Sequence, residues 1–95
     1  MNATQFATAK FRLGRIVATP QALDALEHED ILAAITRHQA GDWGELPKED
    51  CLANDQSLVD GSRIISAYRS TQGVKFWLIT EAGRHVTTVL LPQDY

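Results

Sequence analysis

The chain has 95 residues, of which 44% are hydrophobic and 22% are charged, and its formal net charge at pH 7 is −3. This length fits one globular domain, and the composition excludes a wholly disordered chain. The negative net charge argues against a general nucleic-acid binder, because long-range attraction to phosphates would be weak or absent.

The N-terminal half predicts one strand followed by helices. Residues 1–9 are small and polar and are expected to fray, whereas residues 10–18 alternate as a strand does. Thr19 and Pro20 suit the cap and the first position of a short helix. Apolar spacing predicts a second helix from about Asp30 to Gln39, with His38 on or beside its apolar stripe.

A third helix is expected between Pro47 and Gly61, and three strands follow it. The apolar residues that should face the core of this helix are Cys51, Leu52, Leu58 and Val59, with Cys51 as inert core. Residues 62–70, 74–80 and 85–92 are rich in β-formers and are separated by the short connections TQG and EAGR. The predicted fold is therefore a single α+β domain over residues 1–95. It has an N-terminal strand, two to three helices and a three-stranded antiparallel meander with helices on one face.

Charge is distributed unevenly along the chain. Residues 1–20 hold three basic residues and no acid, whereas residues 21–60 hold ten acids and two basic residues. Residues 61–95 hold four basic residues and two acids. We therefore expect an acidic helical layer and a basic sheet. Such acids are typical of a solvated helix face, and they also suit the binding of a basic protein.

The segment HQAGDWG, residues 38–44, has two interpretations. In the first, Gly41 ends a helix in a left-handed turn and Trp43 covers the corner, its indole N–H seeking an acceptor. In the second, His38 is a general acid or base oriented by Asp42. The glycine favours the first interpretation, because contact between His38 and Asp42 requires the helix to continue. All three of His38, Asp42 and Trp43 stay on the list of candidate binding residues.

The strands offer a second set of candidates. Glu81 and Arg84 are expected to pair across the turn at Gly83. Alternatively, Arg63, Tyr68, Arg84 and His85 could share the open side of the sheet, where arginine binds phosphate and tyrosine or histidine transfers a proton. The odd spacing of Arg63 and Tyr68 places them on opposite faces of a regular strand, which weakens that scheme.

Several classes of site and location have no supporting pattern. The sequence contains one cysteine, which excludes an internal disulfide, and its three histidines lack metal-ligand spacing. We therefore expect no metal site and no cofactor. Without a leader-like segment or an apolar run of about 18 residues, we expect a cytoplasmic protein with no membrane partner.

Four segments carry a resemblance: LGRIVATPQALDAL, GDWGEL, ISAY and WLITEAGRHVTTVLLPQDY. Through them the chain, from Phe11 to Tyr95, resembles a family of small plasmid-related proteins from plasmids and integrated elements. The resemblance implies a mobile-element setting and no particular activity. That family tends to have an acid where this chain has Gly83. More loosely, the order of elements is similar to that of the RelE-like and barnase-like ribonuclease fold.

Two functional hypotheses follow. The first is a non-enzymatic accessory protein of a mobile element that binds another protein, such as a host defence or nucleic-acid-handling factor, through an acidic helical face. Its candidate residues are Glu49, Asp50, Asp55 and Asp60. The second is a RelE-like ribonuclease toxin of a toxin–antitoxin pair, or an inactive relative, which would be metal-independent and act on RNA. The oligomeric state stays open, including a dimer formed through the sheet.

Overall fold

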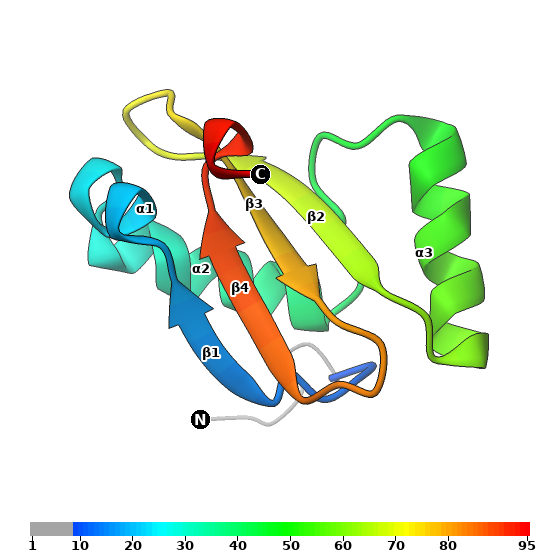
Figure 1. The fold of residues 1–95 in the computed structure, drawn as a ribbon. Helices are drawn as coiled ribbons and strands as arrows, with labels where there is room; N and C mark the ends of the chain where they lie inside the picture. The colour runs from blue at the N-terminus through cyan, green and yellow to red at the C-terminus, as the bar shows by residue number, and fades with distance from the viewer. Residues whose placement is uncertain (1–8) are drawn as a thin grey trace, which may run out of the picture.

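The computed structural model describes residues 9–95 and has an α+β fold, as predicted (Figure 1). The expected frayed lead-in lies almost entirely outside the described residues. In chain order the elements are β1 (Arg15–Ala18), α1 (Pro20–Ala25), α2 (His28–Gln39), α3 (Lys48–Asp60), β2 (Ile64–Arg69), β3 (Lys75–Thr80), β4 (Val86–Leu90) and the short 3₁₀ helix η2 (Pro92–Asp94).

The sheet has four strands in the order β1-β4-β3-β2, one more than the predicted meander. Strands β2, β3 and β4 form the expected antiparallel meander, and β1 adds to its edge in parallel with β4. The backbone N–H of Arg15 donates to His85 O at 2.9 Å, and that of Thr19 donates to Val89 O at 3.0 Å. The parallel pairing is possible because the helices between β1 and β2 provide the long crossover that it needs.

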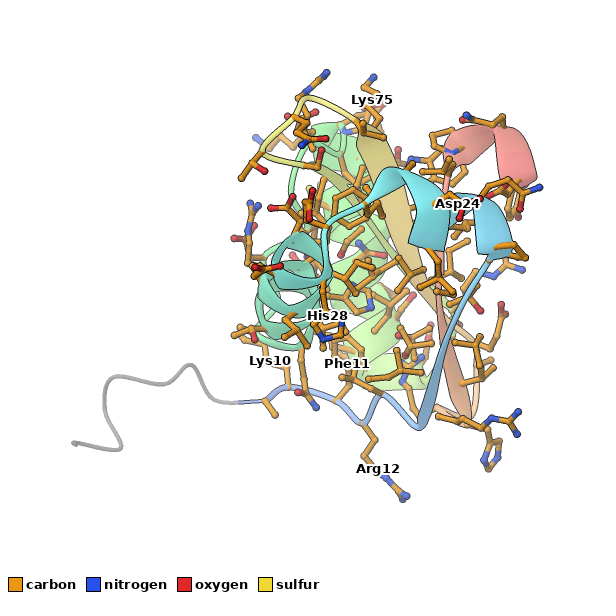
Figure 2. The ribbon with its side chains drawn as sticks, turned by 90° about the vertical axis from the view of Figure 1, so that its left-hand side faces the viewer. Lys10, Phe11, Arg12, Asp24, His28 and Lys75 are labelled. Carbon is orange, nitrogen blue, oxygen red and sulfur yellow. The ribbon has the colours of Figure 1, made fainter. Side chains whose placement is uncertain are left out.

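The N-terminal strand is shorter than predicted, and Gly14 explains why. Gly14 has φ +65°, and a Cβ on it would lie 2.4 Å from the carbonyl carbon of His85. The chain therefore turns at Gly14, where only glycine fits. Residues 10–13 run past the C-terminal end of α2 instead of pairing with β4 (Figure 2). There Lys10 N donates to Gln39 O at 2.8 Å, and the Gln39 side chain donates to Phe11 O at 2.9 Å.

Local signals place the helix ends close to where they were predicted. Thr19 Oγ1 accepts a hydrogen bond from Ala22 N at 3.1 Å and caps α1, with Pro20 as the first helical residue. Helix α2 begins two residues earlier than expected, at His28. Helix α3 ends at Gly61, which has φ +83°.

The hydrophobic core lies between one face of the sheet and helices α1 and α2, which cover that face (Figures 1 and 2). Helix α2 directs Ile31, Ala34 and His38 inward. The fully or nearly fully buried apolar residues of this core are Ala22, Leu26, Ile31, Ala34, Tyr68, Phe76, Leu78, Val89 and Leu91. Because side chains alternate along a strand, Ile65, Ala67 and Trp77 project from the opposite face.

Helix α3 does not join α1 and α2 but lies beside β2 at the edge of the sheet (Figure 1). Its Asn54 side chain donates to Ile65 O at 2.7 Å and accepts from Ile65 N at 3.2 Å. Two residues further along β2, Ala67 N donates to Trp43 O, and Glu45 N donates to Ala67 O. The outer edge of β2 is thereby closed by a side-chain amide and by a short backbone segment, which protects it from pairing with other chains.

This arrangement corrects the predicted orientation of α3. The buried residues of the helix are polar, Asn54 at 3% exposed and Ser57 at 7%. Two of the four residues expected in the core, Leu52 and Val59, are 58% and 82% exposed, and Cys51 is only partly buried. The sheet edge requires hydrogen-bonding groups rather than apolar ones, and this requirement outweighs the apolar pattern of the helix.

Candidate functional site

A chain of hydrogen bonds links four buried polar side chains between α2 and the sheet. His38 Nδ1 lies 2.5 Å from Ser66 Oγ, and His38 Nε2 lies 2.9 Å from Thr80 Oγ1. Thr80 Oγ1 in turn lies 2.7 Å from Thr87 Oγ1. All four side chains are fully buried. We call His38, Ser66, Thr80 and Thr87 the buried polar cluster.

The hydrogen bond from Thr87 to the backbone determines which atom donates in the other hydrogen bonds of this cluster. Thr87 Oγ1 donates to Leu13 O at 2.7 Å, so its only proton is used. Thr80 must then donate to Thr87, and His38 Nε2–H must donate to Thr80. These bonds place a proton on Nε2, and the remaining ring nitrogen, Nδ1, accepts from Ser66 because burial keeps the imidazole neutral.

The surroundings of His38 keep it neutral and closed off from solvent. Burial, together with the nearby positive charge of Arg84, lowers the pKa of His38 from 6.5 to about 4. The rings of Phe11 and Trp43 pack against the imidazole, with centroid distances of 5.1 and 6.1 Å. With both nitrogens engaged and no exposed surface, His38 holds the core together and has no free atom for a substrate.

Asp42 and Trp43 stabilise the turn that follows α2, and their polar groups do not orient His38. The Asp42 carboxylate accepts from Arg37 Nε at 2.7 Å and from Gly44 N at 3.1 Å, and the Arg37 hydrogen bond lowers the pKa of Asp42. The Trp43 indole N–H donates to Asp55 Oδ1 at 3.1 Å. These contacts agree with the interpretation of HQAGDWG as a helix corner covered by an aromatic side chain. The hydrogen bonds of His38 and of Asp42 go to other residues, so the two side chains do not form a pair.

The four candidates on the strands are not brought to one open surface. Tyr68 lies in the core, donates to Asp42 O at 2.5 Å, and has its pKa raised by burial to about 12. Arg63 pairs with Glu81 at 3.2 Å, so the predicted pair of Glu81 and Arg84 is not formed between side chains. His85 is exposed at the turn before β4.

Arg84 has a structural position. Its guanidinium donates to Ser57 O at 2.9 Å and to Ser62 O at 2.6 Å, so it satisfies carbonyls at and beyond the C-terminal end of α3. Its backbone has φ +62°, the one positive value at a non-glycine residue in the described part of the chain. Arg84 thus ties the β3–β4 turn to α3.

The exposed side of α3 is the remaining candidate. Residues Leu52, Gln56 and Val59 follow the spacing i, i+4, i+7 and form one exposed stripe. Glu49 and Asp60 flank it. We call Glu49, Leu52, Gln56, Val59 and Asp60 the outer face of α3.

The four acids proposed for binding have different positions around this helix. Glu49 and Asp60 belong to the outer face, Asp50 lines a cavity on the sheet, and Asp55 accepts from Trp43. All four are exposed, and in residues 9–95 none of them takes part in an ion pair within 4 Å. The three ion pairs present in these residues, Arg37–Asp42, Arg63–Glu81 and Arg69–Glu45, involve no residue of α3.

Sequence reasoning missed Ser66, Thr80, Thr87 and Asn54. A signal for the first three was present: each lies on the same face of its strand as apolar core residues two positions away, and His38 lies on the apolar stripe of a helix. Polar residues at core positions require partners inside the core. Nothing local distinguishes Asn54, since its partner is the edge of a strand that follows it.

Comparisons with protein families, with curated proteins and with solved structures found no match to this chain. In residues 9–95, no helix has both the length and the apolar character that crossing a membrane requires.

Proposed function

We propose that this protein is a non-enzymatic accessory protein of a mobile genetic element and that it binds another protein through the outer face of α3. The observation that carries the proposal is the orientation of α3. Its polar residues Asn54 and Ser57 face the sheet, while Leu52 and Val59 face solvent beside unneutralised acids. The mobile-element part of the proposal rests on the sequence resemblance alone.

The chemistry of this face favours a basic partner that also carries apolar residues. Exposed apolar side chains contribute binding energy when they are buried at an interface, and carboxylates at the rim select the sign of the partner's charge. A protein surface that normally contacts nucleic acid has the required positive charge. Inhibition of such a host factor is the form of the proposal that we favour.

The alternative, a RelE-like ribonuclease toxin or an inactive relative, has less support. A proton-transferring group must reach the substrate, and the Tyr68 hydroxyl is buried and already donates to a backbone carbonyl. The Arg84 guanidinium is occupied by carbonyls of α3 and of the segment after it. No observation brings these groups together around a scissile bond.

The proposal is tested by comparing the partners of two matched variants. In the test variant, Leu52→Gln and Val59→Gln are combined with Glu49→Gln and Asp60→Asn. In the control variant, the exposed residues of α1 and α2 are changed in the same way, by Leu23→Gln, Leu32→Gln, Asp24→Asn and Glu29→Gln. Both sets lie at exposed positions, so both variants should fold.

The expected result is that a protein captured by the wild type is also captured by the control variant and is lost with the test variant. The captured protein is then purified, and its affinity for each variant is measured at two salt concentrations, since rim charges make binding salt-dependent. Equal affinity for the wild type and the test variant would refute the proposal.

A further inference from the structure

A cavity of about 430 Å³ lies on the sheet face opposite α1 and α2, between the N-terminal end of α3 and strands β2 and β3. Its volume is in the range of sites that enclose a ligand or an anchoring side chain. The apolar part of its lining is formed by Leu46, Pro47, Ile65, Ala67 and Trp77. Asp50, an acid of α3 outside its outer face, also lines it.

The small side chain of Ala67 accounts for the hollow. Ala67 lies directly opposite Trp77 in the register of β2 and β3, so a methyl group faces a large indole ring. The ring of Tyr95 packs edge-on against Trp77, with centroids 5.6 Å apart, and holds the indole as a wall. Leu46 and Pro47 form the wall on the other side. The cavity is therefore bounded by the Trp77 indole on one side and by Leu46 and Pro47 on the other.

The two walls are separated by two strand spacings. The segment of residues 43–45 pairs with one edge of β2, and β3 pairs with the other edge. Neighbouring strands lie about 4.8 Å apart, so the walls are about 10 Å apart. An extended peptide covers that distance in about three residues, at about 3.3 Å per residue.

The charged groups are also divided between the two sides. Asp50 belongs to the α3 side and Lys75 to the β3 side, and in residues 9–95 neither is in an ion pair. Glu45, the third charged residue of the lining, is held by Arg69 at 3.3 Å. The α-ammonium and α-carboxylate of a free amino acid share one carbon, so this pair of groups does not span walls that lie about 10 Å apart. A peptide segment does.

We propose that this cavity is an anchor site for an extended segment of the partner protein. One large apolar side chain of that segment fills the space over Ala67 and against Trp77, and a neighbouring lysine or arginine meets Asp50. Lys75 contacts a backbone carbonyl at the other end of the segment. This inference rests on the proposed function and names the recognition chemistry of its partner: an apolar residue flanked by a basic one. Large apolar anchors in desolvated pockets supply much of the energy at protein interfaces.

Capped tripeptides test the site directly, with the indole N–H signals as the readout. The probes are lysine–phenylalanine–alanine, glutamate–phenylalanine–alanine, lysine–alanine–alanine and free phenylalanine, so that only the residue meant for Asp50 is charged. The Trp77 indole lines the cavity, whereas the Trp43 indole is engaged by Asp55 and serves as an internal control. We expect lysine–phenylalanine–alanine to shift the Trp77 signal and to leave the Trp43 signal in place.

Two variants and a control complete the experiment. Ala67→Leu fills the cavity, and Asp50→Asn removes a carboxylate at an exposed position in the first turn of α3. Ala67→Leu should weaken binding of lysine–phenylalanine–alanine about tenfold or more, and Asp50→Asn should weaken it about threefold, the size expected of an exposed charge pair. Ala53→Leu, at an exposed position of α3, should not change it. The peptide with alanine in the centre should bind at least about tenfold more weakly, and the peptide with glutamate should bind about threefold more weakly.

The inference is overturned if no tripeptide shifts the Trp77 signal, or if free phenylalanine binds as tightly as the basic tripeptide. It is also overturned if the charge of the flanking residues makes no difference. Its failure is separable from failure of the proposed function. A partner that is lost with the outer-face variant but retained by Ala67→Leu refutes the anchor site alone, and a partner retained by both variants refutes the function.

Discussion

Acidification should destabilise this fold through His38. The unfolded chain takes up a proton on this histidine as the pH falls through 6.5, whereas the folded chain does not until the pH approaches its lowered pKa of about 4. The folded-state pKa lies below the unfolded one, so stability is complete above 6.5 and is lost as the pH falls from 6.5 toward 4. This direction is opposite to that of a histidine stabilised by a carboxylate.

The size of the effect follows from the two pKa values. Each pKa unit corresponds to about 1.4 kcal/mol, so the complete loss is about 3 kcal/mol. Between about pH 7.5 and about pH 5, the linkage relation gives a loss of about 2 kcal/mol. For a chain of this size, that is a large fraction of a free energy of unfolding of about 5–15 kcal/mol.

Urea unfolding of three proteins measures it. The free energy of unfolding is determined at several pH values for the wild type, for His38→Gln and for the double variant His28→Gln/His85→Gln. The double variant replaces the two exposed histidines and is the control for exchanging a histidine for glutamine. His38→Gln should be less stable at neutral pH but should lose the part of the pH dependence described above.

Equal pH dependence in the wild type and in His38→Gln would refute the reasoning. So would an NMR titration in which the His38 ring takes up its proton near 6.5 while the fold is intact. Either result would mean that the imidazole is reached by water and that the hydrogen bonds to Ser66 and Thr80 do not hold it neutral.

Three further predictions concern α3 and the alternative function. Asn54→Ala should lower the free energy of unfolding by about 2 kcal/mol, because the N–H and C=O of Ile65 lose their partners, whereas Ala53→Ser should have little effect; urea unfolding compares the two. Arg84→Ala should speed hydrogen exchange in the last turn of α3, and Arg84→Gly should be about 1 kcal/mol more stable than Arg84→Ala because it relieves the positive φ. Expression of the wild type should leave bacterial growth and total RNA unchanged; growth arrest relieved by Tyr68→Phe would favour the ribonuclease instead.

Elements with local signals were predictable from the sequence. Thr19 and Pro20 marked the start of α1, and Gly61 marked the end of α3, because capping depends on residues within one turn. Alternation of apolar residues located the three strands of the meander to within about two residues. The pairing of β1 with β4 was not predictable in the same way, since its partner strand lies about 70 residues away and no local pattern specifies the pairing.

The buried polar cluster shows a different limit. Each of its residues has an ordinary local explanation: threonine is common in strands, and a histidine is favourable near the end of a helix. Their role as hydrogen-bond partners can be recognised only once the fold places His38 between Ser66 and Thr80, which are 28 and 42 residues away from it in the sequence. The same distance prevented a choice between a site and a corner for HQAGDWG.

The orientation of α3 links the stability of the fold to the proposed binding surface. If Leu52 and Val59 faced the sheet, the edge of β2 at Ile65 would lose the amide of Asn54, and an open strand edge would be available for uncontrolled pairing. By closing that edge with a polar residue, the helix presents its apolar residues to solvent. Exposed apolar residues cost solubility, and the acids beside them offset that cost. The surface that results is one that a basic, partly apolar partner would cover, and it exists because the sheet edge is closed from within the same chain.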